Sequence, residues 1–259
     1  MARPHEHRLR HELVETAHLC HRQGLLVALD GNLSARLSDS LVLCTRAGCH
    51  KGLVTEEDLI VVDLSGRRVR GRGEPTSELM MHLACYRERP DVEAIVHAHP
   101  PTCIAFTVAG VSLARCILPE VVLTLGSIPT LDYATTGTRE LAELVAGAAR
   151  AHDALMLDRH GAVCLGKDLL DAFCKLETME QVAKVMLAAR TLGDVRDLPS
   201  AEAVHLRELG AARYGGPPVS ALPAACTGCS GCPKPTAAGL GPRAGFSVAR
   251  FCGDSVGKG

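Results

Sequence analysis

The chain has 259 residues, which is enough for one large domain or two small ones, and 47% of them are hydrophobic. There is no Trp, and the other aromatic residues are four Phe and three Tyr, so the core must be mainly aliphatic. Lys and Arg total 28 against 29 Asp and Glu, so no excess charge points to a nucleic-acid or membrane partner. No apolar run approaches the roughly 18 residues of a membrane-spanning helix, and the N-terminus has no apolar signal-peptide core. We therefore expect a cytoplasmic protein.

Apolar periodicity and turn residues predict alternating helices and strands over the first 214 residues. Helices are expected at about residues 5–23, 78–89, 139 onward, 168–192 and 201–213, with another after Pro101. Strands are expected at residues 33–37, 41–45, 60–63, 68–69, 94–99 and 154–157, the first four forming two hairpins. Thr76 or Ser77 is the expected N-cap of the second helix, Thr138 caps a later one, and Gly24 ends the first.

The composition changes abruptly after Tyr214. Residues 215–259 are rich in Gly and Pro, and such a segment cannot bury enough apolar surface to offset the entropy of ordering. We therefore predict a folded domain over residues 1–214 and a disordered Gly/Pro/Cys-rich tail over residues 215–259.

The cysteines fall into two groups. Cys226, Cys229 and Cys232 of the tail have the spacing of part of a zinc knuckle or an iron–sulfur site, with Cys252 as a distant fourth thiol. Exposed thiols of a disordered tail are the favoured interpretation, followed by zinc. The other eight are expected to be small buried hydrophobes: Cys20, Cys44, Cys49, Cys85, Cys103, Cys116, Cys164 and Cys174.

Three histidines stand at the ends of predicted strands. His97 and His99 are two residues apart at the end of an apolar run that Pro100 terminates, so their side chains leave the same face of the sheet. His160 ends a second predicted strand and precedes a glycine. With the carboxylate of Glu78 at a helix start, this set matches a zinc site with an exchangeable position. The alternative is hydrogen-bonded histidines at a sheet edge and a carboxylate that complements the helix dipole.

Three short polar turns could bind a phosphate group. Gly31-Asn32, Ala47-Gly48 and Thr76-Ser77 each lie at a chain reversal, where backbone N–H groups are exposed. Such N–H groups form anion-binding nests, particularly at a helix N-terminus. Each pair taken alone is more often an ordinary turn.

Together these segments resemble the class II aldolase/adducin family, from about Arg8 to Tyr214. Five blocks carry the resemblance: Gly31-Asn32-Leu33-Ser34, Pro75-Thr76-Ser77-Glu78, Ala94-Ile95-Val96-His97-Ala98-His99, Tyr133-Ala134-Thr135-Thr136-Gly137-Thr138 and Arg159-His160-Gly161. Their order and spacing are specific for the superfamily, and the match is strongest to its L-fuculose-1-phosphate aldolase branch. The resemblance implies a three-layer α/β/α fold with a central mixed, largely antiparallel sheet, assembled as a homotetramer with sites between subunits.

The resemblance also implies roles for individual residues. Zinc would be held by His97, His99 and His160. Glu78 would be a ligand in the resting enzyme that leaves the metal to act as a base, and Tyr214 would reach the site of a neighbouring subunit. The phosphate would be held by the three turns, that is by Gly31, Asn32, Ala47, Gly48, Thr76 and Ser77.

Two positions depart from the family pattern. Ala47 stands where the fuculose-phosphate enzymes carry a hydroxyl residue, so one phosphate hydrogen bond is missing unless Arg46 or Lys51 replaces it. The mid-chain tyrosine that donates a proton in the family has no counterpart, and Glu120 is the candidate substitute. The aldehyde part of the substrate is therefore not defined by the resemblance.

The activity that the resemblance implies is a zinc-dependent cleavage of a ketose 1-phosphate, such as L-fuculose 1-phosphate, into dihydroxyacetone phosphate and an aldehyde. Zinc would act as a Lewis acid on the ketose and support the enediolate charge. Related epimerases carry Asp at the position of Glu78, which favours the aldolase. A sugar-phosphate epimerase, a methylthioribulose-1-phosphate dehydratase and a decarboxylating relative are the alternatives. A further alternative, from another class of function, is a non-catalytic adducin-like interaction domain. The presence of Glu78, His97, His99 and His160 disfavours it, because such a domain needs no metal site.

Overall fold

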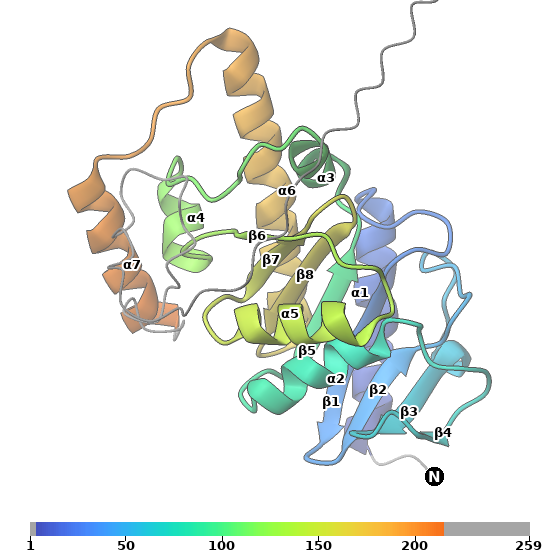
Figure 1. Cartoon of the computed structure of the whole chain (residues 1–259). Coiled ribbons are helices and arrows are strands. Elements are labelled where there is room, and N and C mark those ends of the chain that lie inside the picture. The colour runs from blue at the N-terminus through green and yellow to red at the C-terminus, as the bar shows by residue number, and fades with distance from the viewer. Residues whose placement is uncertain (1–3, 215–259) are drawn as a thin grey trace, which may run out of the picture.

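The computed structural model describes residues 4–214 (Figure 1). The predicted tail, with Cys226, Cys229, Cys232 and Cys252, lies outside the described residues, so the domain boundary and the role of these thiols stay predictions. Among the described helices, none combines the length and the apolar character that crossing a membrane requires.

The centre of the fold is one mixed, largely antiparallel sheet, as the family resemblance predicts. Its strands lie in the order β4-β3-β2-β1-β5-β8-β7-β6, and the β6–β7 pair is parallel whereas the others are antiparallel. The strands are β1 (Asn32–Ser38), β2 (Leu41–Thr45), β3 (Leu59–Asp63), β4 (Arg68–Arg70), β5 (Ala94–Ala98), β6 (Thr130–Leu131), β7 (Ala154–Leu157) and β8 (Gly161–Gly166).

Helices cover both faces of this sheet and complete the expected three layers (Figure 1). The helices are α1 (Pro4–Arg22), α2 (Leu79–Glu88), α3 (Pro101–Val108), α4 (Pro119–Thr124), α5 (Arg139–Ala149), α6 (Leu169–Leu192) and α7 (Ser200–Tyr214), with a 3-10 turn η1 (Glu56–Asp58). The α2–α5 pair packs in one apolar core, and α1, α3 and α6 pack in the other. Helices α4 and α7 contact each other at one end of the molecule.

The central strand β5 illustrates why the apolar runs are continuous rather than alternating. Ile95 enters the core beneath α2 and α5, whereas Val96 and Ala98 enter the core beneath α1, α3 and α6. Both faces of the strand are therefore buried, and each side chain must be apolar or hydrogen-bonded. His97 leaves the strand on the same side as Ile95 and is also fully buried.

Local capping signals identified several element ends correctly. After α1, Leu25 N–H donates to Cys20 O at 2.9 Å, the bond typical of a helix that ends at a following glycine. The Thr138 hydroxyl accepts a hydrogen bond from Leu141 N–H and caps α5 as predicted. The Asp168 carboxylate caps α6 by accepting from Asp171 N–H.

The start of α2 was predicted incorrectly. Glu78, and neither Thr76 nor Ser77, occupies the N-cap position, and its side chain caps no N–H of the helix. The Thr76 hydroxyl accepts from Glu78 N–H at 3.4 Å, and Leu79 N–H donates to Thr76 O, so residues 76–79 form a tight turn before the helix. This turn directs the Glu78 carboxylate away from the helix.

Besides the 3-10 turn η1, three elements were not predicted, because β8 directly follows a turn, β6 has two residues and α4 is a short helix behind Pro119. The buried-cysteine prediction holds for seven of the eight described thiols, whereas Cys174 is exposed. It lies on α6 beside Phe173, which is buried, so its own side chain leaves the helix away from the core.

A close approach between β5 and β8 occurs at Gly161. A Cβ placed on this glycine would lie 2.5 Å from Ala98 O, 2.7 Å from His99 Cδ2 and 3.1 Å from His97 Cε1. Only a residue without a side chain therefore lets β8 run beside the two histidines.

We predict that Gly161→Ala destabilises the protein by about 1–3 kcal/mol, because the added methyl group overpacks this contact. Gly147→Ala is the matched control, since a Cβ there meets nothing within 4 Å and the substitution in a helix should raise stability by about 0.5–1 kcal/mol. Urea unfolding of both variants measures the difference. Equal stability of the two variants would contradict the packing role of Gly161.

Candidate metal and phosphate site

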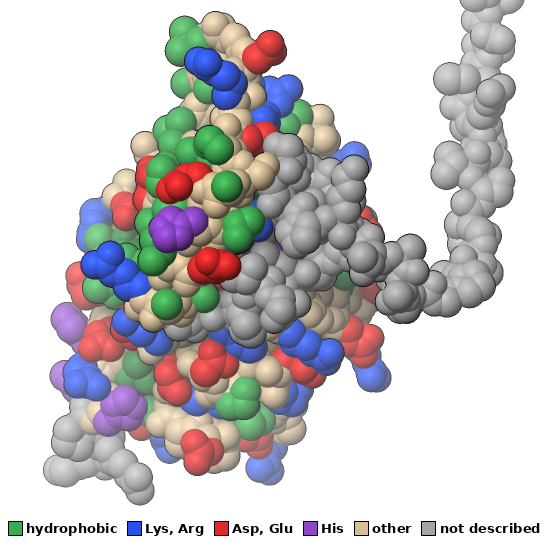
Figure 2. Space-filling model, turned by 90° about the vertical axis from the view of Figure 1, so that its left-hand side faces the viewer, with side chains coloured by type: hydrophobic (Ala, Val, Ile, Leu, Met, Phe, Trp, Pro, Cys, Tyr) green, Lys and Arg blue, Asp and Glu red, His purple; other side chains and the backbone are tan. Residues whose placement is uncertain are grey.

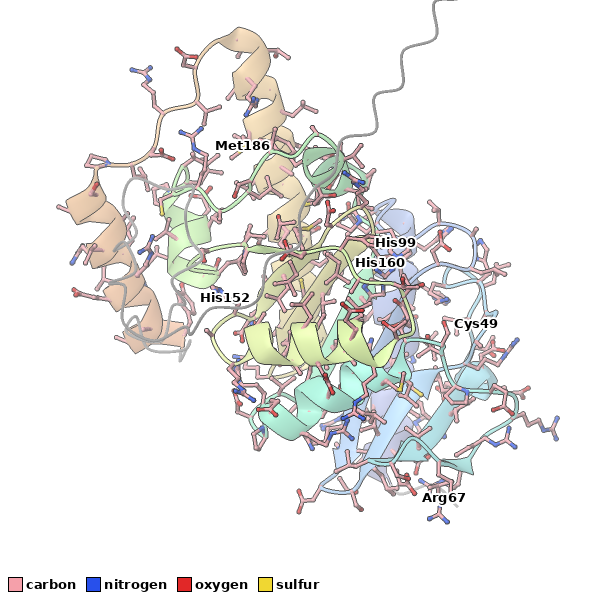
Figure 3. The ribbon with its side chains drawn as sticks, viewed as in Figure 1. Cys49, Arg67, His99, His152, His160 and Met186 are labelled. Carbon is pink, nitrogen blue, oxygen red and sulfur yellow. The ribbon has the colours of Figure 1, made fainter. Side chains whose placement is uncertain are left out.

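Strand pairing brings the three predicted histidines together. Strand β5 carries His97 and ends one residue before His99, and its antiparallel partner β8 begins one residue after His160. The register Ala98↔Ala162 places these ends side by side. The ring centroids form a nearly equilateral triangle with sides of 5.1, 4.8 and 5.0 Å. One ligand atom of each residue lies within 4.8 Å of the others. Figure 3 labels His99 and His160 next to each other.

A backbone carbonyl sets the orientation of the His97 ring. His97 Nδ1 lies 2.9 Å from Ala162 O, and because a carbonyl oxygen accepts, Nδ1 carries the proton and donates it. The lone pair is then on Nε2, which faces His99 Nε2 at 3.3 Å. Metal-binding histidines are commonly oriented in this way by a hydrogen bond from the other ring nitrogen.

The Glu78 carboxylate completes the group. Its Oε2 lies 3.1 Å from His97 Nε2, and its Oε1 lies 3.4 Å from His160 Nε2. The Asn32 amide donates to Oε2 at 2.9 Å, yet Oε1 is buried and makes no hydrogen bond. Buried polar atoms normally have a partner. An unpaired carboxylate oxygen among three imidazoles is what a cation-binding site requires, so these residues fit a metal.

The electrostatics favour the protonation states that bind metal. Burial, together with the charge of the neighbouring His97, lowers the pKa of His99 and of His160 to about 4 each. Burial would raise the pKa of the Glu78 carboxyl, but His97, His160 and the Asn32 amide together hold it well below its usual range. At neutral pH the site therefore contains neutral imidazoles at His99 and His160 and an ionised carboxylate. This donor set is typical of zinc.

The three predicted phosphate turns lie next to each other and to this group. The Asn32–Glu78 hydrogen bond joins the first turn to the third. Arg46 forms a β-bridge with Pro75, which brings the second turn to the third. Ala47 N–H donates to Glu74 O at 2.8 Å, so Ala47 offers an anion neither a hydroxyl nor a free N–H.

The remaining predicted phosphate residues differ in exposure. Thr76 is buried and Ser77 is exposed at the start of α2. Gly48 has φ +67°, and a Cβ there would meet nothing within 4 Å, so space is open above this turn. Arg46, one candidate replacement for the missing hydroxyl, uses Nε to pair with Asp58 at 2.7 Å.

Two other predicted residues do not join the site within one chain. Tyr214 is exposed at the end of α7, and Glu120 is exposed on α4. In Figures 1 and 3 these two helices lie at the left of the molecule, away from His99 and His160. Figure 2 views the molecule from this side, where hydrophobic and charged side chains are mixed.

Neighbouring groups that the sequence did not indicate also contact the site. Asp30 Oδ2 lies 3.7 Å from His99 Nδ1. Beneath the site, the Ser34 hydroxyl lies 2.7 Å from His82 Nδ1 and 2.9 Å from the Tyr86 hydroxyl, all three being buried. The sequence signal that could have indicated His82 is its position one helical turn after Glu78.

Comparisons with known proteins agree with this architecture. The sequence model of the class II aldolase and adducin N-terminal domain matches residues 11–187. The L-fuculose phosphate aldolase of Methanococcus vannielii is 40% identical over 174 residues, which is 67% of this chain and 93% of that protein. The 3-oxo-tetronate 4-phosphate decarboxylase of Haemophilus influenzae is 32% identical over 177 residues, covering 67% of this chain and 84% of that protein.

Solved structures share the fold as well. The crystal structure of L-fuculose-1-phosphate aldolase from Thermus thermophilus superposes with a TM-score of 0.65 at 33% identity, covering 71% of this chain and 95% of that one. The family match spans more than half of the chain and includes all three histidines. The chain belongs to the class II aldolase/adducin family.

Proposed function

We propose that this protein is a zinc-dependent aldolase that cleaves a ketose 1-phosphate resembling L-fuculose 1-phosphate into dihydroxyacetone phosphate and an aldehyde. The observation that carries the proposal is the convergence of Glu78 with His97, His99 and His160 beside three turns suited to a phosphate. Relatives named L-fuculose phosphate aldolase are 35–40% identical and support the substrate class.

In this proposal His97, His99 and His160 hold the metal, with Glu78 as the fourth ligand. When bound there, a zinc ion would supply Lewis-acid polarisation of the ketose carbonyl and its adjacent hydroxyl. Residues of the chain orient the groups, transfer the proton and bind the phosphate. The Asn32 amide orients the Glu78 carboxylate. Glu78 transfers a proton between its own carboxyl oxygen and the substrate carbon from which the aldehyde departs. The turns at Gly31, Gly48 and Ser77 hold the phosphate.

A second group must accept the proton of the hydroxyl that becomes the aldehyde oxygen. Tyr214 of a neighbouring copy is our candidate, in a homotetramer with sites between subunits. Large apolar side chains exposed near the site support such an assembly. Val27 and Leu29 precede the first turn and are each 56% exposed, and Val108 at the end of α3 is 62% exposed. A contiguous exposed apolar patch marks a protein interaction site, and we propose these side chains as part of such a patch.

A second candidate function is decarboxylation of a 3-oxo-tetronate 4-phosphate. Relatives with this name are 31–34% identical. Loss of carbon dioxide from such a substrate leaves the same enediolate of dihydroxyacetone phosphate, but no hydroxyl proton has to be removed. The missing mid-chain tyrosine and the exposed position of Glu120 favour this candidate.

The test is incubation of the zinc-loaded protein with L-fuculose 1-phosphate, 5-deoxyribulose 1-phosphate and 3-oxo-tetronate 4-phosphate, with coupled detection of dihydroxyacetone phosphate. We expect cleavage of a ketose 1-phosphate. Product from the tetronate alone would establish the decarboxylase. An epimerase or a dehydratase would change the substrate without releasing dihydroxyacetone phosphate. A purified protein that binds no zinc and converts none of these substrates would favour the adducin-like interaction domain.

His97→Ala should remove the bound metal and the activity together, because it deletes the buried central ligand. Loss of a group that only hydrogen-bonds to a metal ligand lowers metal affinity roughly 10- to 100-fold. We expect loss of the ligand His97 itself to lower zinc affinity by more than this. His205→Ala on the exposed face of α7 is the control and should bind zinc normally. Elemental analysis after dialysis measures both, and retention of zinc by His97→Ala would refute the ligand assignment.

Glu78→Gln should separate metal binding from proton transfer. Glutamine keeps the shape of the side chain but cannot accept a proton, so turnover should fall roughly 100- to 10,000-fold. Three imidazoles remain, so most of the zinc should be retained. Glu143→Gln, which alters an exposed carboxylate on α5, should leave turnover unchanged. Steady-state kinetics measure the turnover. Normal turnover of the Glu78→Gln protein would exclude Glu78 as the proton-transferring group.

A further inference from the structure

A buried cation lies directly behind two of the phosphate turns. Lys51 is 2% exposed, and its ammonium donates to Leu29 O at 2.7 Å and to Cys49 O at 2.9 Å. Leu29 stands two residues before Gly31, and Cys49 directly follows Gly48. The Lys51 side chain therefore connects the first and second turns and places a positive charge between them.

This charge has no close counterion. Within residues 4–214, no carboxylate lies within ion-pair distance of Lys51, and two neutral carbonyls take two of its three ammonium protons. Burial lowers the pKa of Lys51 more than the nearby Cys49, Asp30 and Glu78 raise it. Removing an ammonium group from water without a paired anion is unfavourable. A bound anion would offset this cost.

The other largely buried lysine provides a comparison. Lys175 pairs with Asp153 at 2.9 Å and with Asp171 at 3.0 Å, and it also donates to Leu165 O. Burial lowers its pKa, but these carboxylates outweigh burial and raise it above the usual value. Lys175 thus has its counterions within the protein, whereas Lys51 does not.

The surroundings of Lys51 specify the kind of anion. The Gly48 N–H has no acceptor among the described residues, and space is open above it. Ala47 contributes no donor, so the second turn alone is a weak anion site. A phosphate monoester has three acceptor oxygens and about two negative charges, which suits an ammonium beside a glycine N–H.

We propose that Lys51 binds the phosphate of the substrate and supplies the charge that the second turn lacks. The proposal rests on the proposed function for the identity of the phosphorylated ligand. Lys51 has two separable effects in this position. Its two hydrogen bonds hold the turns together, and its charge attracts the dianion. Only the second effect requires a cation.

The experiment is calorimetric titration of the full, zinc-loaded chain with inorganic phosphate, dihydroxyacetone phosphate and dihydroxyacetone. Lys51→Gln keeps two N–H donors for the carbonyls but removes the charge, and Lys51→Arg keeps the charge. We expect Lys51→Gln to weaken both phosphate ligands on the order of 10- to 100-fold, with zinc content and dihydroxyacetone binding unchanged. Lys51→Arg should bind phosphate more tightly than Lys51→Gln. Lys167→Gln, at an exposed lysine before α6, is the control.

Phosphate binding by a folded Lys51→Gln within twofold of wild type would overturn the proposal. Equal weakening of dihydroxyacetone and its phosphate would also overturn it, because that result describes a structural clamp. If Lys51→Gln does not fold, NMR of the lysine ammonium groups in the wild-type protein replaces it, and an unchanged Lys51 signal at saturating phosphate contradicts the proposal. Lys51-dependent phosphate binding in a protein that cleaves no substrate would instead refute the proposed function alone.

Discussion

The structure depends on the antiparallel pairing of β5 with β8. This pairing sets the ends of two strands side by side, so that His160 meets His97 and His99, which precede it by 63 and 61 residues. The Gly161 contact allows the strands to approach at the rings, and the Ala162 carbonyl orients His97. The meeting of the three histidines is therefore set by the pairing of two central strands.

Unpaired polar atoms gather around the histidines. Two other buried or largely buried charges are compensated: Lys175 pairs with Asp153 and Asp171, and the Glu180 carboxylate accepts from the N–H groups of Thr102 and Cys103 at the start of α3. Around the histidines, Glu78 Oε1 and His160 Nδ1 have no hydrogen-bond partner. Buried polar groups without partners destabilise a fold. Their concentration at one place, next to the uncompensated Lys51, is consistent with a site that binds a cation and an anion together.

This arrangement also explains why closely similar relatives carry out different reactions. The aldolases and the decarboxylases named among the relatives both act on sugar phosphates. In the chemistry proposed above, both leave negative charge on the same three-carbon phosphate, so the same donor set and the same turns serve either. The two proposed reactions differ in the group that leaves, and within one chain neither Glu120 nor Tyr214, the candidate residues for that step, joins the histidines. We therefore expect substrate choice to depend on residues other than Glu78 and the three histidines.

Much of this protein follows from the sequence by itself. The strand ending in His97 and His99, the hairpins over residues 33–45 and 60–69, and the Thr138 cap depend on local periodicity and turn chemistry, and the structure confirms them. The order of the family blocks indicated the fold class and the histidine set. Strand β8 and the true start of α2 could not be read locally, because each is set by its tertiary neighbours. Glu78 could not be distinguished from a helix-capping carboxylate, since its role depends on Asn32 and His97, which lie far away in the chain. The tertiary structure alone decided which charges are compensated, because that depends on distances between segments, and no local pattern encodes them.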